Sequence, residues 1–413
     1  MTMFGINESE VTALVHAVSD SDADYDGMRD RFARAVWMGL AEPGDRMAGL
    51  VVSALGAARA LDAVIDAWTA PAWIGELGAS GASEITHAEI TSAAERWRPR
   101  ATTAGSLSSL RHAARIGARL LTPGSAGWPE GLDDLGLHAP MALWLRGTDA
   151  ALAALPRSIA LVGARAATGY GEHVTMEASA GLVDRGYAIV SGAAYGIDGM
   201  AHRAALASHG HTIAFLAGGV DRFYPSGHDA LLTRIVESGA VLSELPCGEP
   251  PTKWRFLQRN RLIAAASRAT IVLEAGWRSG SLNTAGHAAA LGRPLGAVPG
   301  PVTSAASAGC HRLIREFDAV CVTNADEMAE LAPLSDLSAD RDRSSGGESD
   351  LVPGGGGHPF HTRVLDALSS RSPRQAADVA ARAGMSVSEV RAVLAILALD
   401  GVVAERERGW VRR

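Results

Sequence analysis

Cysteine and lysine are nearly absent from this chain of 413 residues, which contains three cysteines and one lysine. Cys247, Cys310 and Cys321 are widely spaced and form no Cys-x-x-Cys pair, so we expect neither a disulfide framework nor a metal site. Because the lone lysine is Lys253, no Gly-Lys-Ser/Thr phosphate loop is present. This excludes ATP hydrolysis by that route, and almost all positive charge is guanidinium.

Long apolar runs are also missing. No stretch is both long enough and sufficiently free of charge to span a bilayer, and residues 1–22 lack a basic segment before an apolar core. We therefore expect no membrane insertion, no secretory signal and a cytoplasmic location. The formal net charge of -7 argues against a wholly electrostatic nucleic-acid binder, although it does not exclude local basic patches.

The length and pattern predict several domains. Residues 1–105 have a helical pattern that is interrupted by the breaker Glu42-Pro43-Gly44, and residues 106–333 form an α/β region with an extended lead-in. Residues 334–359 are rich in Ser, Asp and Gly and predict a flexible linker. Residues 360–413 predict a small domain of three short helices and a hairpin, which suggests a winged helix.

The α/β region alternates regularly between short apolar runs and helical segments. This pattern predicts a doubly wound, mostly parallel sheet with helices on both faces, that is, a Rossmann-like fold. We expect a helix from Gly169 to Asp184. The expected strands are Ile159–Val162, Ala188–Val190, Thr212–Leu216, Val241–Ser243, Thr270–Leu273, Leu295–Val298 and Ala319–Val322.

Glycines stand at the strand-to-helix corners of this region. In a doubly wound sheet these corners share one edge, where ligands bind, and bare backbone amides there can approach an anion. The corners are Gly163-Ala164-Arg165, Ser191 to Asp198, Ala217-Gly218-Gly219 and Ser279-Gly280-Ser281. No Gly-x-Gly-x-x-Gly with a later acid is present, so we expect no nicotinamide cofactor and no other cofactor. Taken alone, each corner is equally compatible with a tight turn that binds nothing.

One corner is followed by the acid-free run Lys253 to Arg261, which contains four positive charges. Arginines at the start of a helix supply charge for phosphates and planar surfaces for bases. We expect Arg165 and Arg259 to contact nucleic acid and Phe256 to offer a stacking face. Phosphate is the predicted ligand.

Three residues of this run have competing interpretations. Arg261 can contact phosphate, or it can pair with Glu274 or Asp198 inside the protein. Asn260 can bind a base or a loop carbonyl, or it can cap a helix, and Phe256 itself fits a core position equally well.

An enzymatic interpretation is also open. Asp198 and His202 are four residues apart on an expected helix, which is the spacing of an acid-base pair. We favour a structural role, in which Asp198 caps the helix and His202 makes a packing hydrogen bond. Glu244 and Glu274 follow strands, but neither lies in a recognisable nucleophile arrangement.

Several motifs occur together in a characteristic order. They are Ser191-Gly192 with Gly196-Ile197-Asp198, Arg259-Asn260-Arg261-Leu262-Ile263-Ala264, Glu274-Ala275, Arg278-Ser279-Gly280-Ser281-Leu282 and Val298-Pro299-Gly300. In these motifs the chain resembles the DNA-processing protein A (DprA/Smf) family, from Trp128-Pro129 to about Met328. The termini show a weaker similarity to that family's sterile-alpha-motif-like and winged-helix-like domains.

The resemblance implies a non-catalytic protein without a cofactor. Such a protein binds single-stranded DNA, acts as a homodimer and loads the RecA recombinase in natural transformation or recombination. The DNA-binding residues implied by position and chemistry are Gly163, Arg165, Gly192, Tyr195, Gly196, Lys253, Phe256, Arg259, Asn260, Arg261, Ser279, Gly280 and Ser281.

The sequence departs from the family pattern at two positions. Tyr195 replaces a basic residue before Gly196, and Leu257 replaces the proline that commonly follows Phe256. Tyrosine can stack but cannot neutralise a phosphate, so we expect weaker or less salt-sensitive DNA binding. The alternative function is that of a nucleotide-processing enzyme of the Rossmann-like phosphoribohydrolase type, whose Pro-Gly-Gly-x-Gly-Thr-x-x-Glu motif is replaced here by Glu274 to Ser281.

The expected recognition helix of the C-terminal domain is mostly apolar and carries Glu389 close to Arg391. Such a surface is poorly suited to reading a DNA groove. Docking to a partner or within the chain is at least as well supported by these residues as DNA contact.

Overall fold

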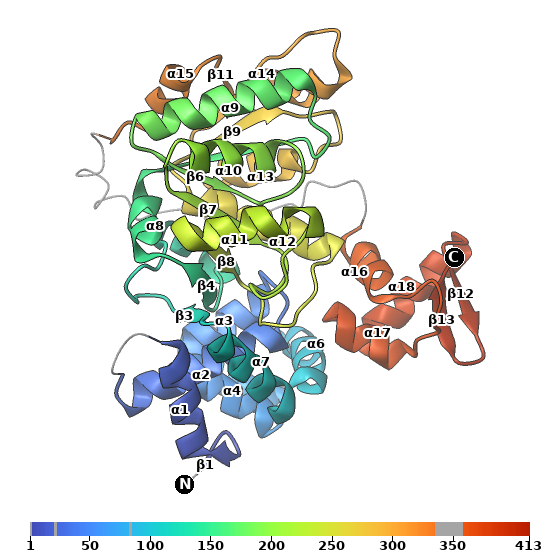
Figure 1. The fold of residues 1–413 in the computed structure, drawn as a ribbon. Helices are drawn as coiled ribbons and strands as arrows, with labels where there is room; N and C mark the ends of the chain where they lie inside the picture. Colours follow the sequence, from blue (N-terminus) through green and yellow to red (C-terminus); the bar gives the residue numbers. More distant parts are fainter. Residues whose placement is uncertain (1, 20–22, 82–84, 335–357) are drawn as a thin grey trace.

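The computed structural model describes residues 2–19, 23–81, 85–334 and 358–413. Apart from its ends, the predicted linker 334–359 lies outside the described residues. Figure 1 shows the N-terminal helices packed against one end of a large α/β layer, with a small C-terminal domain beside both.

The N-terminal part is helical, as predicted. Three buried tryptophans, Trp37, Trp73 and Trp97, form an edge-to-face cluster in its core. The predicted domain boundary at residue 105 falls inside a helix, α7, which packs on α1 and α2 and extends the bundle. The elements are β1 (Thr2–Met3), β2 (Ile6–Asn7), α1 (Glu8–Val18), α2 (Tyr25–Leu40), α3 (Arg46–Leu55), α4 (Ala57–Ile65), α5 (Ala70–Ala79), α6 (His87–Trp97), η1 (Arg98–Arg100) and α7 (Thr103–Arg115).

The α/β part contains a nine-stranded sheet of order β11-β10-β9-β5-β6-β7-β8-β4-β3. All predicted strands are present and parallel, and the lead-in adds the antiparallel edge strands β3 and β4. The strands are β3 (Arg119–Leu121), β4 (Leu143–Gly147), β5 (Ser158–Gly163), β6 (Ala188–Ser191), β7 (Thr212–Leu216), β8 (Ala240–Ser243), β9 (Ala269–Glu274), β10 (Leu295–Ala297) and β11 (Val320–Cys321).

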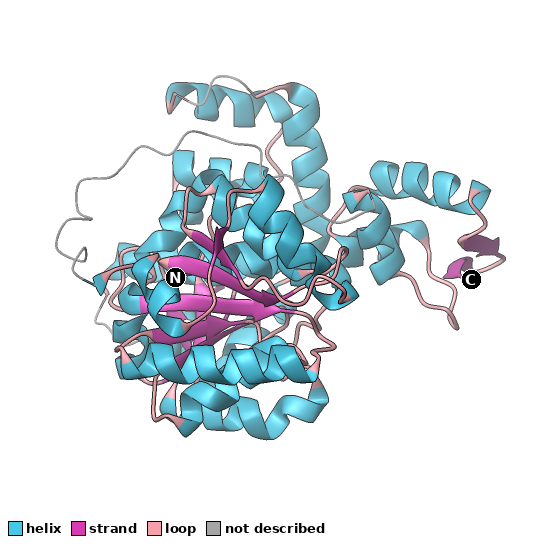
Figure 2. Ribbon diagram, turned by 90° about the horizontal axis from the view of Figure 1, so that it is seen from above, coloured by secondary structure: helices cyan, strands magenta, loops and turns pink. Residues whose placement is uncertain are grey.

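Helices cover both faces of this sheet (Figure 2). Alternate residues of β5 point to opposite cores, with Ile159 and Leu161 toward α9 and α10 and Ala160 and Val162 toward α12 and α13. The helical elements are η2 (Glu130–His138), α8 (Asp149–Ala154), η3 (Leu155–Arg157), α9 (Gly169–Asp184), α10 (Ile197–Ala207), η4 (Ser226–His228), α11 (Asp229–Ser238), α12 (Lys253–Ala266), α13 (Ser281–Ala290), η5 (Ala305–Ser307), α14 (Ala308–Glu316) and α15 (Ala325–Glu330).

The strand order reverses at β5, which pairs with β6 on one side and with β9 on the other. Since β5, β6, β7 and β9 are parallel, the glycine corners that follow them lie at one edge of the sheet, as predicted. This edge, called the glycine rim below, consists of residues 163–168, 191–198, 217–225 and 275–281. Ligands of doubly wound sheets bind at such a position.

The C-terminal domain has the predicted three helices and hairpin, in the order of a winged helix. Gly384 ends the second helix in a left-handed conformation, φ 61°, and Ser386 caps the third with a capping box to Glu389. The elements are α16 (Pro359–Ala367), α17 (Ala376–Ala383), α18 (Val387–Leu399), β12 (Val403–Arg406) and β13 (Gly409–Arg412).

In the described part of the chain, no single helix has the length and apolar character needed to cross a membrane. Only α3 and α4 taken together, which meet at 112°, pass that test by length and composition.

One buried histidine links the folded state to pH. His202 on α10 has no exposed surface, and its Nδ1 lies 2.7 Å from the Thr212 hydroxyl, which itself donates to the Ile189 carbonyl. The hydroxyl therefore accepts from a neutral imidazole. Burial, together with the nearby His228 and Arg259, lowers the pKa of His202 to about 3. The imidazole thus has the packing role that its sequence position suggested.

The pH dependence of stability tests this burial. Below pH ~6.5 the unfolded chain takes up a proton at His202 that the native chain does not, so this contribution to stability is complete above pH ~6.5 and declines toward pH ~3. In His202→Gln we expect the unfolding free energy to decrease less steeply as the pH is lowered, by about 1.4 kcal/mol per pH unit below pH ~6. Urea titrations from pH 7 to 4.5 measure this slope. An unchanged slope in His202→Gln, or an equal change in a variant of the exposed His87, contradicts the assignment.

Candidate nucleic-acid interface

The corners after β5 and β6 touch each other through bare backbone. The amide of Ile197 donates to the Ala164 carbonyl at 3.1 Å, and a Cβ at Gly196, φ 75°, would collide with the Ala164 and Arg165 carbonyls. Only glycine fits between the two corners at this point. The close approach fixes where the exposed Arg165 side chain leaves the rim.

A buried carboxylate organises the second corner. Asp198, in the first turn of α10, accepts hydrogen bonds from the amides of Gly192 at 3.2 Å and Ala194 at 3.4 Å. It therefore holds the preceding loop rather than capping the helix end. Burial raises the pKa of this carboxyl, against the opposing effect of Arg259. Asp198 and His202 have separate partners and do not form an acid-base pair.

Arg259 lies directly beneath the same corner. Its guanidinium donates to the Gly192 carbonyl at 2.7 Å and to the Phe215 carbonyl, and any side chain at position 192 would overlap it. Burial lowers the pKa of Arg259 to about 10, so the side chain remains charged at neutral pH. Since only 5% of Arg259 is exposed, it supports the loop and contributes positive potential from below rather than reaching out to a ligand.

The exposed surface above this loop is aromatic and basic. The Arg165 guanidinium lies 4.8 Å from the centroid of the half-buried Phe256 ring, and Tyr224 lies 5.5 Å from the same ring. Tyr224 is 48% exposed. Within the described residues Arg165 has no hydrogen-bond or ion-pair partner, so its donors remain available to a ligand.

Two further predicted residues border this surface. Tyr195 is 48% exposed and packs edge-on against His228 at 4.9 Å. Lys253, at the first position of α12, is exposed and precedes Phe256 by three residues, so both lie on one face of the helix. Together with Arg165, Tyr224 and Phe256 they form what we call the aromatic-basic patch.

Asn260 and the serine corner form a supporting layer. The Asn260 amide donates to the Gly280 carbonyl at 3.4 Å and to the Asn283 side chain at 3.1 Å, which ties α12 to the corner after β9. Ser279 and Ser281 share a hydroxyl hydrogen bond of 2.8 Å. The structure gives Asn260 the loop-carbonyl contact that the sequence left open.

Arg261 does not join the patch. It is 1% exposed and forms a bidentate pair with Glu244 at 2.8 and 2.7 Å, while its Nε donates to the His138 carbonyl. The expected phosphate contact is therefore absent from this arrangement, and the ion-pair partner is neither of the two acids considered from sequence. Glu244, at the end of β8, faces the opposite side of α12 from Phe256.

The carboxylates of this edge have structural partners. Glu274, which is 2% exposed, accepts hydrogen bonds from the Thr168 amide at 2.9 Å and the Thr168 hydroxyl at 2.6 Å. Glu244 holds Arg261, and Asp198 holds the β6 corner. Among the described residues no group of three metal-ligating side chains occurs.

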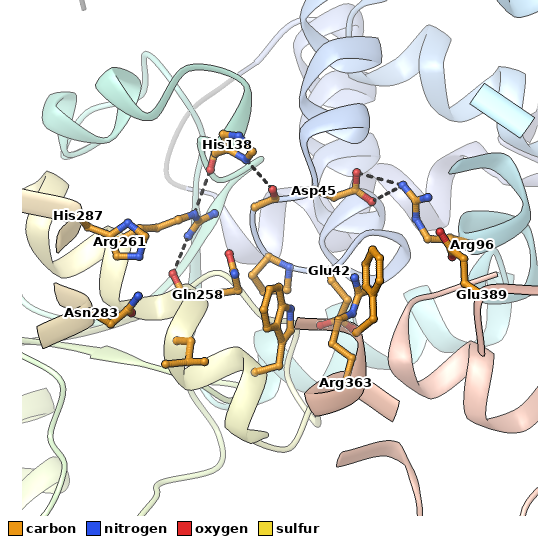
Figure 3. Close-up of a pocket in the computed structure, with 15 residues that line it drawn as sticks. Glu42, Asp45, Arg96, His138, Gln258, Arg261, Asn283, His287, Arg363 and Glu389 are labelled. Atoms are coloured by element: carbon orange, nitrogen blue, oxygen red, sulfur yellow. Dashed lines mark hydrogen bonds and ion pairs between the residues drawn. The ribbon is translucent and has the colours of Figure 1, made fainter. Parts of the chain in front are cut away.

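A cavity of about 290 Å³ lies on the other side of α12. Figure 3 shows its walls, to which the N-terminal domain contributes Glu42 and Arg96, the α/β part Gln258 and the C-terminal domain Arg363. The cavity lies where the three domains meet, and no residue of the glycine rim lines it.

Sequence reasoning missed Tyr224 and the contacts of Glu42. Tyr224 follows the glycine corner after β7, and an aromatic residue at such a corner is a readable signal for a stacking surface. Glu42 was recognised only as part of a helix breaker.

Comparisons with known proteins identify the family of the chain. A family model described as DNA recombination-mediator protein A matches residues 119–333, and a DprA winged helix domain model matches residues 358–407. The chain is 45% identical over 307 residues to a putative DNA processing protein DprA of Mycobacterium tuberculosis, covering 72% of this chain and 77% of the relative.

Two further similarities lie in the same family. Protein Smf of Escherichia coli is 37% identical over 279 residues, covering 66% of this chain and 72% of that protein. The X-ray structure of DprA from Streptococcus pneumoniae matches with a TM-score of 0.50 and 31% identity, covering 63% of this chain and 92% of that chain. This chain is therefore a member of the DNA-processing protein A (DprA/Smf) family, as its sequence motifs predicted.

Proposed function

We propose that this protein binds single-stranded DNA along the glycine rim. The observation that carries the proposal is the stack of Arg165 on Phe256 beside the exposed Tyr224, above a loop supported from below by Arg259. Unpaired bases stack on aromatic faces, and free guanidinium and ammonium groups bind the phosphates between them.

The shape of the patch favours single strands over duplexes. Ring faces are useful to a ligand only when its bases are unstacked, and the patch consists of loop residues and the first turns of α12 rather than a helix that projects into a groove. Gly280, where an added Cβ would meet nothing within 4 Å, would let the strand approach the backbone beside the two serines, whereas Gly163, Gly192 and Gly196 make room for neighbouring protein atoms.

The wider role follows from family membership. We propose that the protein acts in the cytoplasm as a homodimer, protects incoming DNA and loads RecA recombinase during natural transformation or recombination. Asp198, Glu244 and Glu274 all form hydrogen bonds or ion pairs within the protein. This supports a binding role over the nucleotide-processing alternative, because a catalytic carboxylate must be available to its substrate.

Arg165→Ala should weaken binding of a fluorescent oligothymidine by about tenfold, because the variant loses both a hydrogen-bond donor to phosphate and a stacking partner. The slope of log K against log salt should fall in magnitude by about 0.7. Arg157→Ala is the matched control, since Arg157 is an exposed arginine immediately before β5, at the opposite end of the same strand. Equal losses in both variants, or none in Arg165→Ala, contradict the interface.

Phe256→Ala should reduce affinity by about tenfold while leaving the salt slope nearly unchanged, because stacking rather than charge is removed. Phe256→Tyr should retain most of the affinity. Phe317→Ala, an exposed phenylalanine on another surface, serves as the control. Fluorescence anisotropy at several salt concentrations separates the two contributions, and a changed slope in Phe256→Ala would argue against a stacking role.

Tyr195→Lys restores the basic residue that the family pattern has at this corner. We expect the salt slope to increase by about 0.7 and low-salt affinity to rise, because one more phosphate is neutralised. If the slope does not move, the strand does not pass Tyr195. Incubation of the wild-type chain with nucleotides in the same buffers tests the enzymatic alternative, which turnover without DNA binding would support.

A further inference from the structure

Helix α12 contributes side chains to two different surfaces. Lys253 and Phe256 face the glycine rim, whereas Trp254, Gln258 and Arg261 line the cavity between the domains. Residues 254, 258 and 261 follow helical spacing, so this second face is continuous. A ligand on one face of this helix is therefore separated from whatever binds the other face by about the 10–12 Å diameter of a helix.

The winged helix docks against this region through its helix-turn-helix corner. Arg100 donates to the Ala381 carbonyl at 2.7 Å and to the Arg382 carbonyl at 3.4 Å. A Cβ at Gly384 would lie 2.5 Å from the Glu42 side chain, so the turn between α17 and α18 fits directly against the N-terminal domain. Figure 1 shows α16 beside α12, and the two helices are in contact.

Glu42 is the hub of this docking. Its carboxylate, buried at 7% exposure, accepts from Arg255 of α12 at 2.9 and 3.1 Å and from Arg100, and it faces Arg363 of the winged helix across the cavity wall (Figure 3). Burial acts to raise the pKa of Glu42, but the arginines outweigh it and hold the pKa far below its usual range. The hub thus joins all three domains at neutral pH.

Asp366 of α16 brings a negative charge to the beginning of α12. Its carboxylate accepts from the Trp254 backbone amide at 3.0 Å, one peptide bond from Lys253. The Arg363 guanidinium lies 5.6 Å from the Trp254 ring and secures the same contact. An anion therefore already interacts with the amino end of α12, beside the lysine of the aromatic-basic patch.

The start of the recognition helix also contacts the N-terminal domain in the docked winged helix. In a helix-turn-helix the first residues of the recognition helix approach the bases. Here Glu389, in the first turn of α18, accepts from Ser92 of α6 at 3.3 Å and lines the cavity. Docking therefore brings Glu389 against α6, while Ser388 and Arg391 remain exposed.

From these contacts, and on the basis of the proposed function, we propose that the winged helix is autoinhibitory, a role that we call the latch. In its docked position it places the Asp366 carboxylate beside Lys253 on the path of the bound strand. Strand binding and docking therefore oppose each other. The interacting species is the phosphate backbone of single-stranded DNA. A phosphate approaching Lys253 meets the carboxylate, and the conflict is relieved when α16 leaves α12. Linkage requires the converse as well, so undocking strengthens strand binding.

Asp366→Asn tests the charge with little change in shape, because the amide oxygen can still accept from Trp254. We expect oligothymidine affinity at low salt to rise about fivefold, the factor that one like charge a few ångströms away contributes in water. Asp378→Asn is the matched control, since Asp378 is a carboxylate on α17 that pairs with Arg382 of its own helix. Equal gains in both variants, or no gain in Asp366→Asn, overturn the latch.

The movement itself can be measured in the otherwise native chain. Cys247 and Cys310 are buried and Cys321 is exposed, so a dye couples to Cys321 and a second to the thiol of a Leu399→Cys variant, at a position 89% exposed on α18. Saturating oligothymidine should lower the transfer efficiency between the dyes. Unchanged efficiency at saturation contradicts the proposal even if the Asp366 variant fails to fold.

The two hypotheses fail in different ways. If Arg165→Ala binds the oligonucleotide as well as the wild type, the proposed interface is wrong. If Arg165→Ala weakens binding as expected but the energy transfer does not change at saturating oligothymidine, only the autoinhibitory proposal is wrong.

Discussion

The arrangement depends on two buried charges that hold one loop from opposite sides. The Asp198 carboxylate binds the amides of the β6 corner, and the Arg259 guanidinium binds the Gly192 carbonyl from beneath. Both groups are removed from water, so leaving either without its partners would be costly. This cost holds the loop that carries Tyr195 in one position, next to the surface where Arg165 stacks on Phe256.

A single helix connects the three domains to that loop. The start of α12 supplies Lys253 and Phe256 to the rim, Arg255 to the Glu42 hub and the Trp254 amide to the winged helix. The acid-free run noted in the sequence is therefore shared between surface and interior. Arg255 pairs with Glu42 of the N-terminal domain and Arg261 with Glu244 of its own domain, so neither of these two arginines is available to a ligand.

The sequence was sufficient for the sheet, because buried parallel strands are continuous apolar runs bounded by glycine, and the helix predicted from Gly169 to Asp184 has those ends in the structure. It predicted nucleic-acid contact for Arg259 and left the role of Arg261 open, whereas both side chains are buried against protein groups. Their partners, Gly192 and Glu244, approach only in the folded chain. The domain boundary predicted at residue 105 lies inside α7, which packs on α1 and α2. The sequence supported docking of the C-terminal domain to a partner or within the chain but could not give its contacts, because Arg100 and Ala381, which form one of them, are 281 residues apart.

The central claim is that an unpaired strand lies on the aromatic-basic patch. Photocrosslinking of the native chain to an oligonucleotide carrying 5-bromodeoxyuridine, followed by mass spectrometry of the peptides, locates the bases directly. The account predicts cross-links at Phe256, Tyr224 or Tyr195. Cross-links confined to the winged helix, or to the edge of the sheet that carries Arg157, would contradict it.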